Sequence, residues 1–348
     1  MSLYCSNQTE NETFYFKSSK TILMMSEIYH IHHPIISLSS LSIGLILSVF
    51  NIVILNIKNM LTPTTYMLTR IGVMDIFTMV IYIPYVLYFH IFNPCDIYRG
   101  IVKRWAAYFL FIYIIIVNLS HCTSIWLAIM LSGFRLRCLR NLNFNIVLAW
   151  KQVRFLSWIV LVVTCFISIL NYFTINLIKY KDPDYGTVYT IKMTKHYLIG
   201  IQALIVKIIP SITLSVLAGA ITFELKRFIR LGKCIGKQRH ISNTTYTLVA
   251  LVLLFIFLES PQGIIIFISA FNMLFFTEIY NPLGDMLDLM TIIRTIANFC
   301  MYCIMDRRYR NTFVNIICPF KQINAHRKDN VLYPLCKRKF SLPNYKVN

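Results

Sequence analysis

The sequence predicts an all-α fold, a seven-transmembrane helix bundle with a short amphipathic helix after the seventh span. Of the 348 residues, 57% are hydrophobic and only 14% are charged, whereas soluble domains carry about 25% charged residues. A stretch of about 20 apolar residues can cross a hydrocarbon core of about 30 Å. Seven such stretches are present, and their connections are too short for a second domain: 35–57, 67–92, 105–131, 153–177, 197–223, 246–271 and 283–305.

The positions of Lys and Arg predict the orientation of the bundle, because these residues concentrate in cytoplasmic segments. With the N-terminus outside, the cytoplasmic side, span ends included, holds 23 of the 34 Lys and Arg residues but only 3 of the 14 acids. We therefore expect residues 1–34 to be extracellular, 35–305 to form the membrane domain, 306–318 to form the amphipathic helix and 319–348 to be a cytoplasmic tail. The basic face suits an anionic lipid leaflet, so a lipid membrane is the expected partner and nucleic acid is not.

Three candidate modification sites, of two kinds, agree with this orientation. Asn7 and Asn11 begin Asn-X-Thr sequons in the expected extracellular segment, where glycosylation takes place. Cys318 follows the basic stretch after the last span, a position suited to palmitoylation. Only Cys5 and Cys95 lie on the oxidising side, so they are the candidate pair for an outer disulfide.

The sequence gives little indication of a metal, a cofactor or catalysis. The run His30-Ile31-His32-His33 could chelate a metal, but its place beside the first span favours a solvated segment, so we expect no metal site. There is no Gly-rich phosphate loop, no HExxH and no nucleophile beside a positioned base. We expect no cofactor, and a protein that is not an enzyme.

Several short motifs are distributed over the spans. The second span contains "LTRIGVMD", and the third ends "IWLAIMLSGFRLR" with an arginine at its cytoplasmic end. Together these motifs resemble those of rhodopsin-like (class A) G-protein-coupled receptors, and the matching positions are Asn51, Asp75, Arg135, Trp158, Pro210 and Pro261.

Four longer segments indicate a narrower group: "TPTTYMLTRIGVMD", "KIIPS", "ESPQG" and "NFCMYCIMDRRYRNTF". They resemble segments of invertebrate myosuppressin and FMRFamide-type peptide receptors and of nematode serpentine class W receptors. Glu259 precedes Pro261 by two residues, where most class A receptors have tryptophan. Asn298-Phe299 and Tyr302 stand where others have NPxxY. The chain departs from the wider class at Phe134 and Leu136 beside Arg135, at Ala218, at Arg294 and in an outer loop (179–196) without cysteine.

The resemblance implies a multi-pass receptor of the plasma membrane that binds an RF-amide-type neuropeptide and activates a heterotrimeric G-protein. A chemosensory receptor for a small molecule is the first alternative. A transporter is the second, although transporters often contain internal repeats and this sequence has none.

Glu259 and Lys207 are ionisable residues within apolar spans, where a charge costs several kcal/mol. Lys207 precedes Pro210 by three residues, and in receptors of this shape the two kinked segments face each other. We predict a Lys207–Glu259 ion pair below the ligand cavity, with Pro261 and Tyr302 as further switch candidates. The alternative is that each charge snorkels or binds water separately. Gln262 or water would satisfy the backbone carbonyl that Pro261 leaves free.

Acidic and aromatic residues indicate where a ligand would bind. Asp285 and Asp288 lie three residues apart, hence on one helix face, and Glu278 adds a third acid at the outer end. They would attract the arginine of an RF-amide peptide; a solvated helix start is the alternative. Tyr82 and Tyr85 could line an aromatic pocket or belong to an interfacial belt.

Arg294 yields the most specific expectation. Many receptors of this class hold a sodium ion between a second-span aspartate, a third-span serine and polar groups of the seventh span. Asp75 and Ser124 match the first two. Arg294 precedes Asn298 by four residues and shares its helix face, so we expect the guanidinium to take the place of the cation. The alternative is that Arg294 points elsewhere or marks a decaying copy.

At the cytoplasmic end, the resemblance places Arg135 and Arg137 around the opening for the G-protein, although topology alone would also require a basic face. In "DRRYRNTFVNIIC", the side chains of Tyr309 and Phe313 fall along one side. This pattern indicates an amphipathic helix lying on the inner leaflet.

Overall fold

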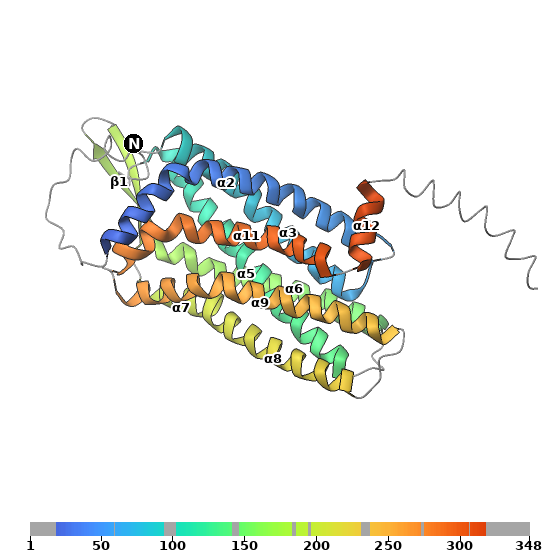
Figure 1. Ribbon diagram of the computed structural model, residues 1–348. Coiled ribbons are helices and arrows are strands. Elements are labelled where there is room, and N and C mark those ends of the chain that lie inside the picture. Colours follow the sequence, from blue (N-terminus) through green and yellow to red (C-terminus); the bar gives the residue numbers. More distant parts are fainter. Residues whose placement is uncertain are drawn as a thin grey trace, which may run out of the picture.

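The computed structural model describes residues 19–58, 60–93, 102–140, 146–182, 186–193, 196–230, 237–272, 275–305 and 307–317. Within these ranges seven helical segments are long and apolar enough to cross a membrane, which confirms the seven-span bundle (Figure 1). They are α2 (Ser19–Leu55), α3 (Pro63–Val86) with the π-helical segment η1 (Leu87–Phe92), α5 (Arg104–Arg140), α6 (Ile146–Thr174), α7 (His196–Ala203) with η2 (Leu204–Ile208) and α8 (Ile209–Arg230), α9 (Lys237–Phe271), and α11 (Asn281–Met305) after η3 (Phe276–Tyr280).

The start of α3 illustrates how local sequence fixes a helix end. Thr62 is the N-cap, and its Oγ1 accepts the backbone N–H of Thr65 at 3.1 Å. The Thr65 hydroxyl accepts the backbone N–H of Thr62 at 2.7 Å, which completes a capping box. Pro63 follows at the first helical position, where its missing N–H costs nothing.

Several helices extend beyond the apolar windows that predicted them. α2 begins at Ser19, so it includes part of the segment predicted to be extracellular, and α9 begins at Lys237 rather than near residue 246. An apolar run marks only the part of a helix that lipid can cover. The backbone hydrogen bonds of a helix continue through flanking polar residues without penalty.

A β-hairpin, which the sequence did not predict, follows the fourth span. β1 (Ile175–Asp182) pairs antiparallel with β2 (Gly186–Met193). The fourth span therefore ends at Thr174, and its predicted extension to residue 177 is wrong. Tyr189 and Val102 exchange two backbone hydrogen bonds of 2.9 Å, which hold the hairpin beside the start of α5. Backbone pairing thus anchors this cysteine-free loop.

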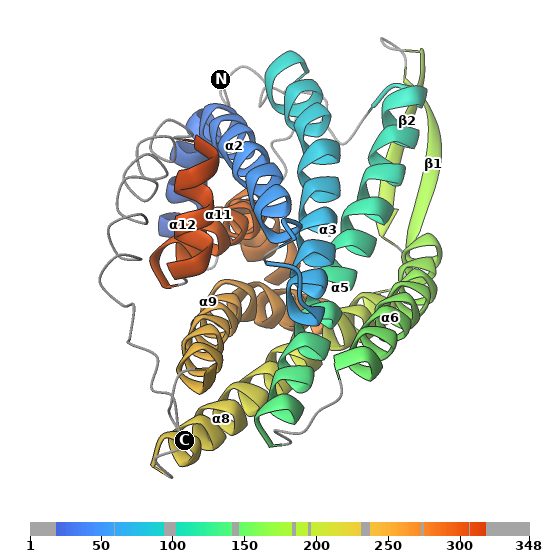
Figure 2. The same ribbon diagram turned by 90° about the vertical axis from the view of Figure 1, so that its right-hand side faces the viewer.

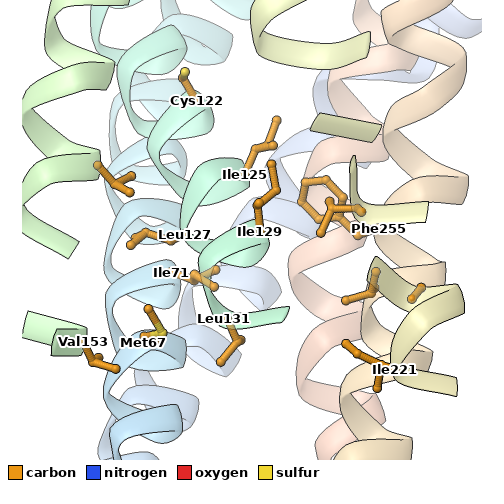
Figure 3. Close-up of a cluster of buried hydrophobic side chains, with 14 of the residues drawn as sticks. Met67, Ile71, Cys122, Ile125, Leu127, Ile129, Leu131, Val153, Ile221 and Phe255 are labelled. Carbon is orange, nitrogen blue, oxygen red and sulfur yellow. The ribbon is translucent and has the colours of Figure 1, made fainter. Parts of the chain in front are cut away.

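The centre of the bundle is α5, which contacts α3, α6, α8 and α9. In the end-on view the other spans are arranged around it, with α12 beside α2 and α11 (Figure 2). An apolar cluster fills the half of the bundle toward the cytoplasmic end expected from the sequence (Figure 3). Its members include Met67 and Ile71 of α3, Ile125 and Leu131 of α5, Val153 of α6, Ile221 of α8 and Phe255 of α9.

The helix α12 (Arg307–Ile317) follows the seventh span and confirms the predicted amphipathic helix. Tyr309 is fully buried, and its hydroxyl donates to Oδ1 of Asn51 in α2 at 3.0 Å. Its ring stacks on Tyr302 with centroids 5.4 Å apart. Phe313 packs against the apolar cluster that contains Tyr302 and Tyr309, whereas Ile316 is exposed. The apolar face is therefore divided between the bundle and the surface.

Candidate functional site

Seven buried polar side chains meet inside the bundle, and we call them the polar core. They come from five spans that are far apart in sequence, so only the folded bundle brings them together. The members are Asp75 of α3, His121 and Ser124 of α5, Lys207 of η2, Glu259 and Gln262 of α9, and Arg294 of α11.

Lys207 and Glu259 form the ion pair that the sequence predicts. Nζ of Lys207 lies 2.6 Å from Oε2 of Glu259, and both side chains are almost completely shielded from solvent. The alternative, separate snorkelling, is wrong. Gln262 also joins this group, because its Oε1 accepts a hydrogen bond from Lys207 Nζ at 2.8 Å.

Two local features allow Lys207 to reach Glu259. The chain before Pro210 forms the π-helical segment η2 instead of a regular α-helix, and π-helical turns are frequent at functional sites. On the facing helix, Gly263 gives η2 room for a close approach. A Cβ added at Gly263 would lie 2.8 Å from Cβ of Lys207, closer than side chains tolerate.

His121 completes this part of the polar core, and the sequence analysis missed it. Its Nε2 lies 3.0 Å from Oε2 of Glu259 and also contacts Nζ of Lys207. Because a ring nitrogen either donates or accepts, Nε2 can donate to Glu259 or accept from Lys207, but not both. An available signal was the histidine itself, since ionisable residues are rare within spans.

Arg294 connects the Lys207–Glu259 pair with Asp75. Nη2 of Arg294 lies 2.7 Å from Oδ1 of Asp75, and its Nε lies 3.3 Å from Oε1 of Glu259. Ser124 donates to the same Asp75 oxygen at 3.1 Å, and the guanidinium stands 5.1 Å from the ring centre of Phe255. The predicted contact between Arg294 and Asp75 is confirmed, and the alternative that Arg294 points elsewhere is wrong.

The charges of the polar core balance. With His121 neutral, the ammonium of Lys207 and the guanidinium of Arg294 offset the carboxylates of Asp75 and Glu259. Each charge alone would cost several kcal/mol at this depth. Removing one partner of a buried pair typically costs about 3–5 kcal/mol, because the other charge is left uncompensated. The network therefore favours a single arrangement of the five spans that supply it.

A second group, which we call the aromatic–acidic cluster, lies near the end of the bundle opposite α12. The rings of Tyr85 and Tyr113 stack with centroids 4.3 Å apart and planes 4° apart. Tyr82, only 4% exposed, packs against both. Because these tyrosines face the interior, the interpretation of Tyr82 and Tyr85 as a lipid-facing belt is wrong. Asp288 is half-buried within electrostatic range of all three.

The acids of this cluster are more enclosed than a solvated helix start would be. The side chain of Asp285 is 16% exposed, and its Oδ1 lies 3.9 Å from Nε2 of His90. The backbone of Glu278 lies in η3, and its side chain is outside the described residues. Among the described residues, the buried hydroxyl of Tyr82 has no hydrogen-bond partner.

His33 corrects another expectation. The HIHH run was expected to be solvated, and His32 is indeed exposed, but His33 is fully buried. Its ring centre lies 4.7 Å from that of His90 in η1. The helix α2 continues through this run, so successive side chains point in different directions and only part of the run meets water.

The remaining predicted residues are distributed along the bundle. Arg135 is half-buried and Arg137 exposed near the end of α5, where Arg140 contacts Glu224 of α8 at 3.0 Å. Asn298 is half-buried one turn after Arg294, and Tyr302 is buried against α12. The described ranges do not include Asn7, Asn11, Cys318, Cys5 or Cys95.

Comparison with known proteins agrees with this geometry. Residues 35–319 match the family described as serpentine type 7TM GPCR chemoreceptor Srw. The chain is also similar to the G-protein coupled receptor dmsr-1 of Caenorhabditis elegans, with 24% identity over 414 aligned positions that cover 96% of this chain and 79% of that protein. Receptors of this kind are multi-pass plasma-membrane proteins, not a class of enzyme. This protein belongs to the Srw family of serpentine seven-transmembrane G-protein-coupled receptors.

Proposed function

We propose that the protein is a cell-surface receptor for an amidated peptide ending in Arg-Phe, and that it activates a heterotrimeric G-protein at the α12 end. The observation that carries the proposal is the aromatic–acidic cluster. Half-buried Asp285 and Asp288 stand beside the stacked rings of Tyr85 and Tyr113, and Tyr82, which packs against both rings, has a buried hydroxyl without a hydrogen-bond partner among the described residues. A guanidinium and an aromatic ring are the groups that such a cluster would bind best.

The proposed orientation puts the N-terminus and this cluster outside the cell. The charge distribution supports it, because Lys and Arg gather toward the α12 end. Within this arrangement Asn7 and Asn11 would carry sugar, Arg135 and Arg137 would face the G-protein, and Cys318 would be lipidated. The polar core lies between the two ends and would transmit the signal, since it joins α9 to α5, η2 and α11, and α11 in turn to α3.

The test is a thermodynamic cycle between ligand and receptor. Cells that express the protein are exposed to amidated peptides ending in Arg-Phe, and nucleotide exchange on the G-protein is measured. Replacing the peptide arginine by uncharged citrulline should weaken potency on the unmutated receptor by about tenfold or more, the value of a charged hydrogen bond. On a receptor with Asp285→Asn and Asp288→Asn, the same replacement should have little further effect.

Met286 provides a matched control, because it lies between the two acids on α11 but is exposed. Met286→Ala should leave peptide potency and the citrulline effect unchanged. Equal potency of the arginine and citrulline peptides on the unmutated receptor would refute the acidic contact.

A small-molecule chemoreceptor is the second candidate, and the description of the family as chemoreceptors favours it. The nucleotide-exchange assay also distinguishes the chemosensory function from the peptide function. If a broad panel of Arg-Phe-amide peptides gives no response while volatile or soluble small molecules activate the receptor, the chemosensory function replaces the peptide function.

A further inference from the structure

Two histidines and one aspartate from three different elements converge near the end of the bundle opposite α12. His33 lies in α2, His90 in η1 and Asp285 near the start of α11. One possible ligand atom from each lies within 4.8 Å of the others. Nε2 of His90 is 3.9 Å from Oδ1 of Asp285, and the two imidazole rings are 4.7 Å apart between centres.

The three side chains are close to the spacing that a metal ion requires. Zinc binds histidine nitrogen and carboxylate oxygen at about 2.0–2.2 Å, so neighbouring ligand atoms in a tetrahedral site lie about 3.3 Å apart. Small side-chain rotations would bring His90 and Asp285 from 3.9 Å to this separation. His33 is fully buried, and the side chains of His90 and Asp285 are only 8% and 16% exposed, so a bound ion would be largely shielded from water.

The surroundings of His33 also suit a metal ligand. Ligating histidines usually donate their second ring N–H to an oxygen acceptor, which fixes the ring. The hydroxyls of Tyr29 and Ser37 each lie 3.1 Å from Nδ1 of His33, and the Ser37 hydroxyl is also 3.4 Å from Nε2.

We propose that His33, His90 and Asp285 form a zinc-binding site that joins α2, η1 and α11. Two imidazoles and one carboxylate are a ligand set typical of zinc, and the fourth position would be open to water or to a ligand. The partial exposure of Asp285 provides access from the end of the bundle opposite α12. Binding would hold together elements that are far apart in sequence, and it does not depend on the identity of the agonist.

The first test measures stability of the purified full-length receptor in detergent with zinc chloride. An ion that binds only the folded state raises the apparent Tm, and the increase grows with zinc concentration. We expect an upward shift of several degrees in the unmutated protein and no shift in His33→Gln or His90→Gln. His32→Gln is the matched control, since His32 is exposed in the same run, and it should retain the full shift.

A second test looks for an absorption band that a variant gains, so it gives a clear result even if the histidine-to-glutamine variants fold poorly. Cobalt chloride replaces zinc, because a tetrahedral cobalt site absorbs visible light and thiolate ligands add a sulfur-to-cobalt charge-transfer band. The His90→Cys variant should acquire this band at the site, whereas His32→Cys should not.

Absence of any zinc-dependent Tm shift, or a shift that persists in both His33→Gln and His90→Gln, would overturn the proposal. The same spectra from His90→Cys and His32→Cys would also overturn it. Each readout is metal binding alone, so neither result depends on the proposed peptide ligand.

Discussion

Arg294 of α11 and Asp75 of α3 form a buried ion pair, with Nη2 2.7 Å from Oδ1 and both side chains less than 5% exposed. The same guanidinium reaches Glu259, whose other oxygen binds Lys207. Two ion pairs thereby become one connected network across the bundle. The consequences of this connection can be tested by removing its members one at a time and together.

The first prediction concerns the coupling between Arg294 and Asp75. Arg294→Gln leaves Asp75 and Glu259 without their shared cation, and should lower stability by about 3–5 kcal/mol. The Asp75→Asn, Arg294→Gln double variant should lose less than the sum of the single variants, since neither partner is left alone. Thermal unfolding of the purified protein measures the cycle. Simple additivity would show that the two charges do not interact.

The second prediction concerns sodium. Because Arg294 brings a fixed positive charge beside Asp75 and Ser124, agonist binding should not change when sodium is replaced by a bulky organic cation at equal ionic strength. Arg294→Asn should introduce sodium sensitivity, and the Arg294→Asn, Asp75→Asn double variant should lose it again. Ordinary inhibition of agonist binding by sodium in the unmutated receptor would contradict this expectation.

A third prediction concerns His121 and the Lys207–Glu259 pair. Lys207→Met leaves Glu259 with His121 and Arg294, so the polar contacts of η2 with Glu259 and Gln262 are lost while the carboxylate keeps other partners. We expect altered basal G-protein activation at unchanged surface expression, because η2 and α9 would no longer share an ion pair. Thr213→Val is a control on α8, since the Thr213 hydroxyl donates to the carbonyl oxygen of Ile209 in its own helix at 2.8 Å. Equal basal activation in both variants and the unmutated receptor would exclude a switch at this pair.

The sequence predicted the paired charges well, because a charge inside an apolar span must find a partner and few were available. Lys207 had Glu259, and Arg294 had Asp75. It did not predict that Arg294 would also reach Glu259, since helix rotation and the π-helical turn η2 determine which side chains meet. The β1–β2 hairpin was missed because its pairing depends on contacts across the loop and with Val102, which hydropathy does not record.

His33 shows a related limit. Its burial depends on the direction in which α2 presents it and on the position of His90, which lies 57 positions later in the chain. A local run of histidines cannot distinguish the exposed His32 from the buried His33. For the same reason, the aromatic residues of the second span indicated a pocket and a lipid belt equally well until their facing direction was known.

The topology provides the fourth prediction. If the N-terminus is extracellular, Asn7 or Asn11 should carry sugar, and removal of both sequons by Asn→Gln should increase the mobility of the protein on a denaturing gel. Glycosidase treatment should have no effect on the double variant. A protein without sugar at either position, together with protease access to the C-terminal tail in intact cells, would reverse the orientation.

The last prediction concerns Gly263, which lies on α9 where η2 approaches closely. A methyl group at this position would meet Cβ of Lys207 at 2.8 Å, so Gly263→Ala should push η2 away from α9 and lengthen the Lys207–Glu259 contact. We expect a lower Tm and a change in basal activation in the same direction as in Lys207→Met. The matched control is Gly219→Ala on α8, where an added Cβ would have no neighbour within 4 Å. Alanine there should be neutral or stabilising by up to about 1 kcal/mol, because glycine is the weaker helix former. If Gly263→Ala has the same Tm and basal activation as Gly219→Ala, the close approach of η2 and α9 is not what holds Lys207 in the polar core.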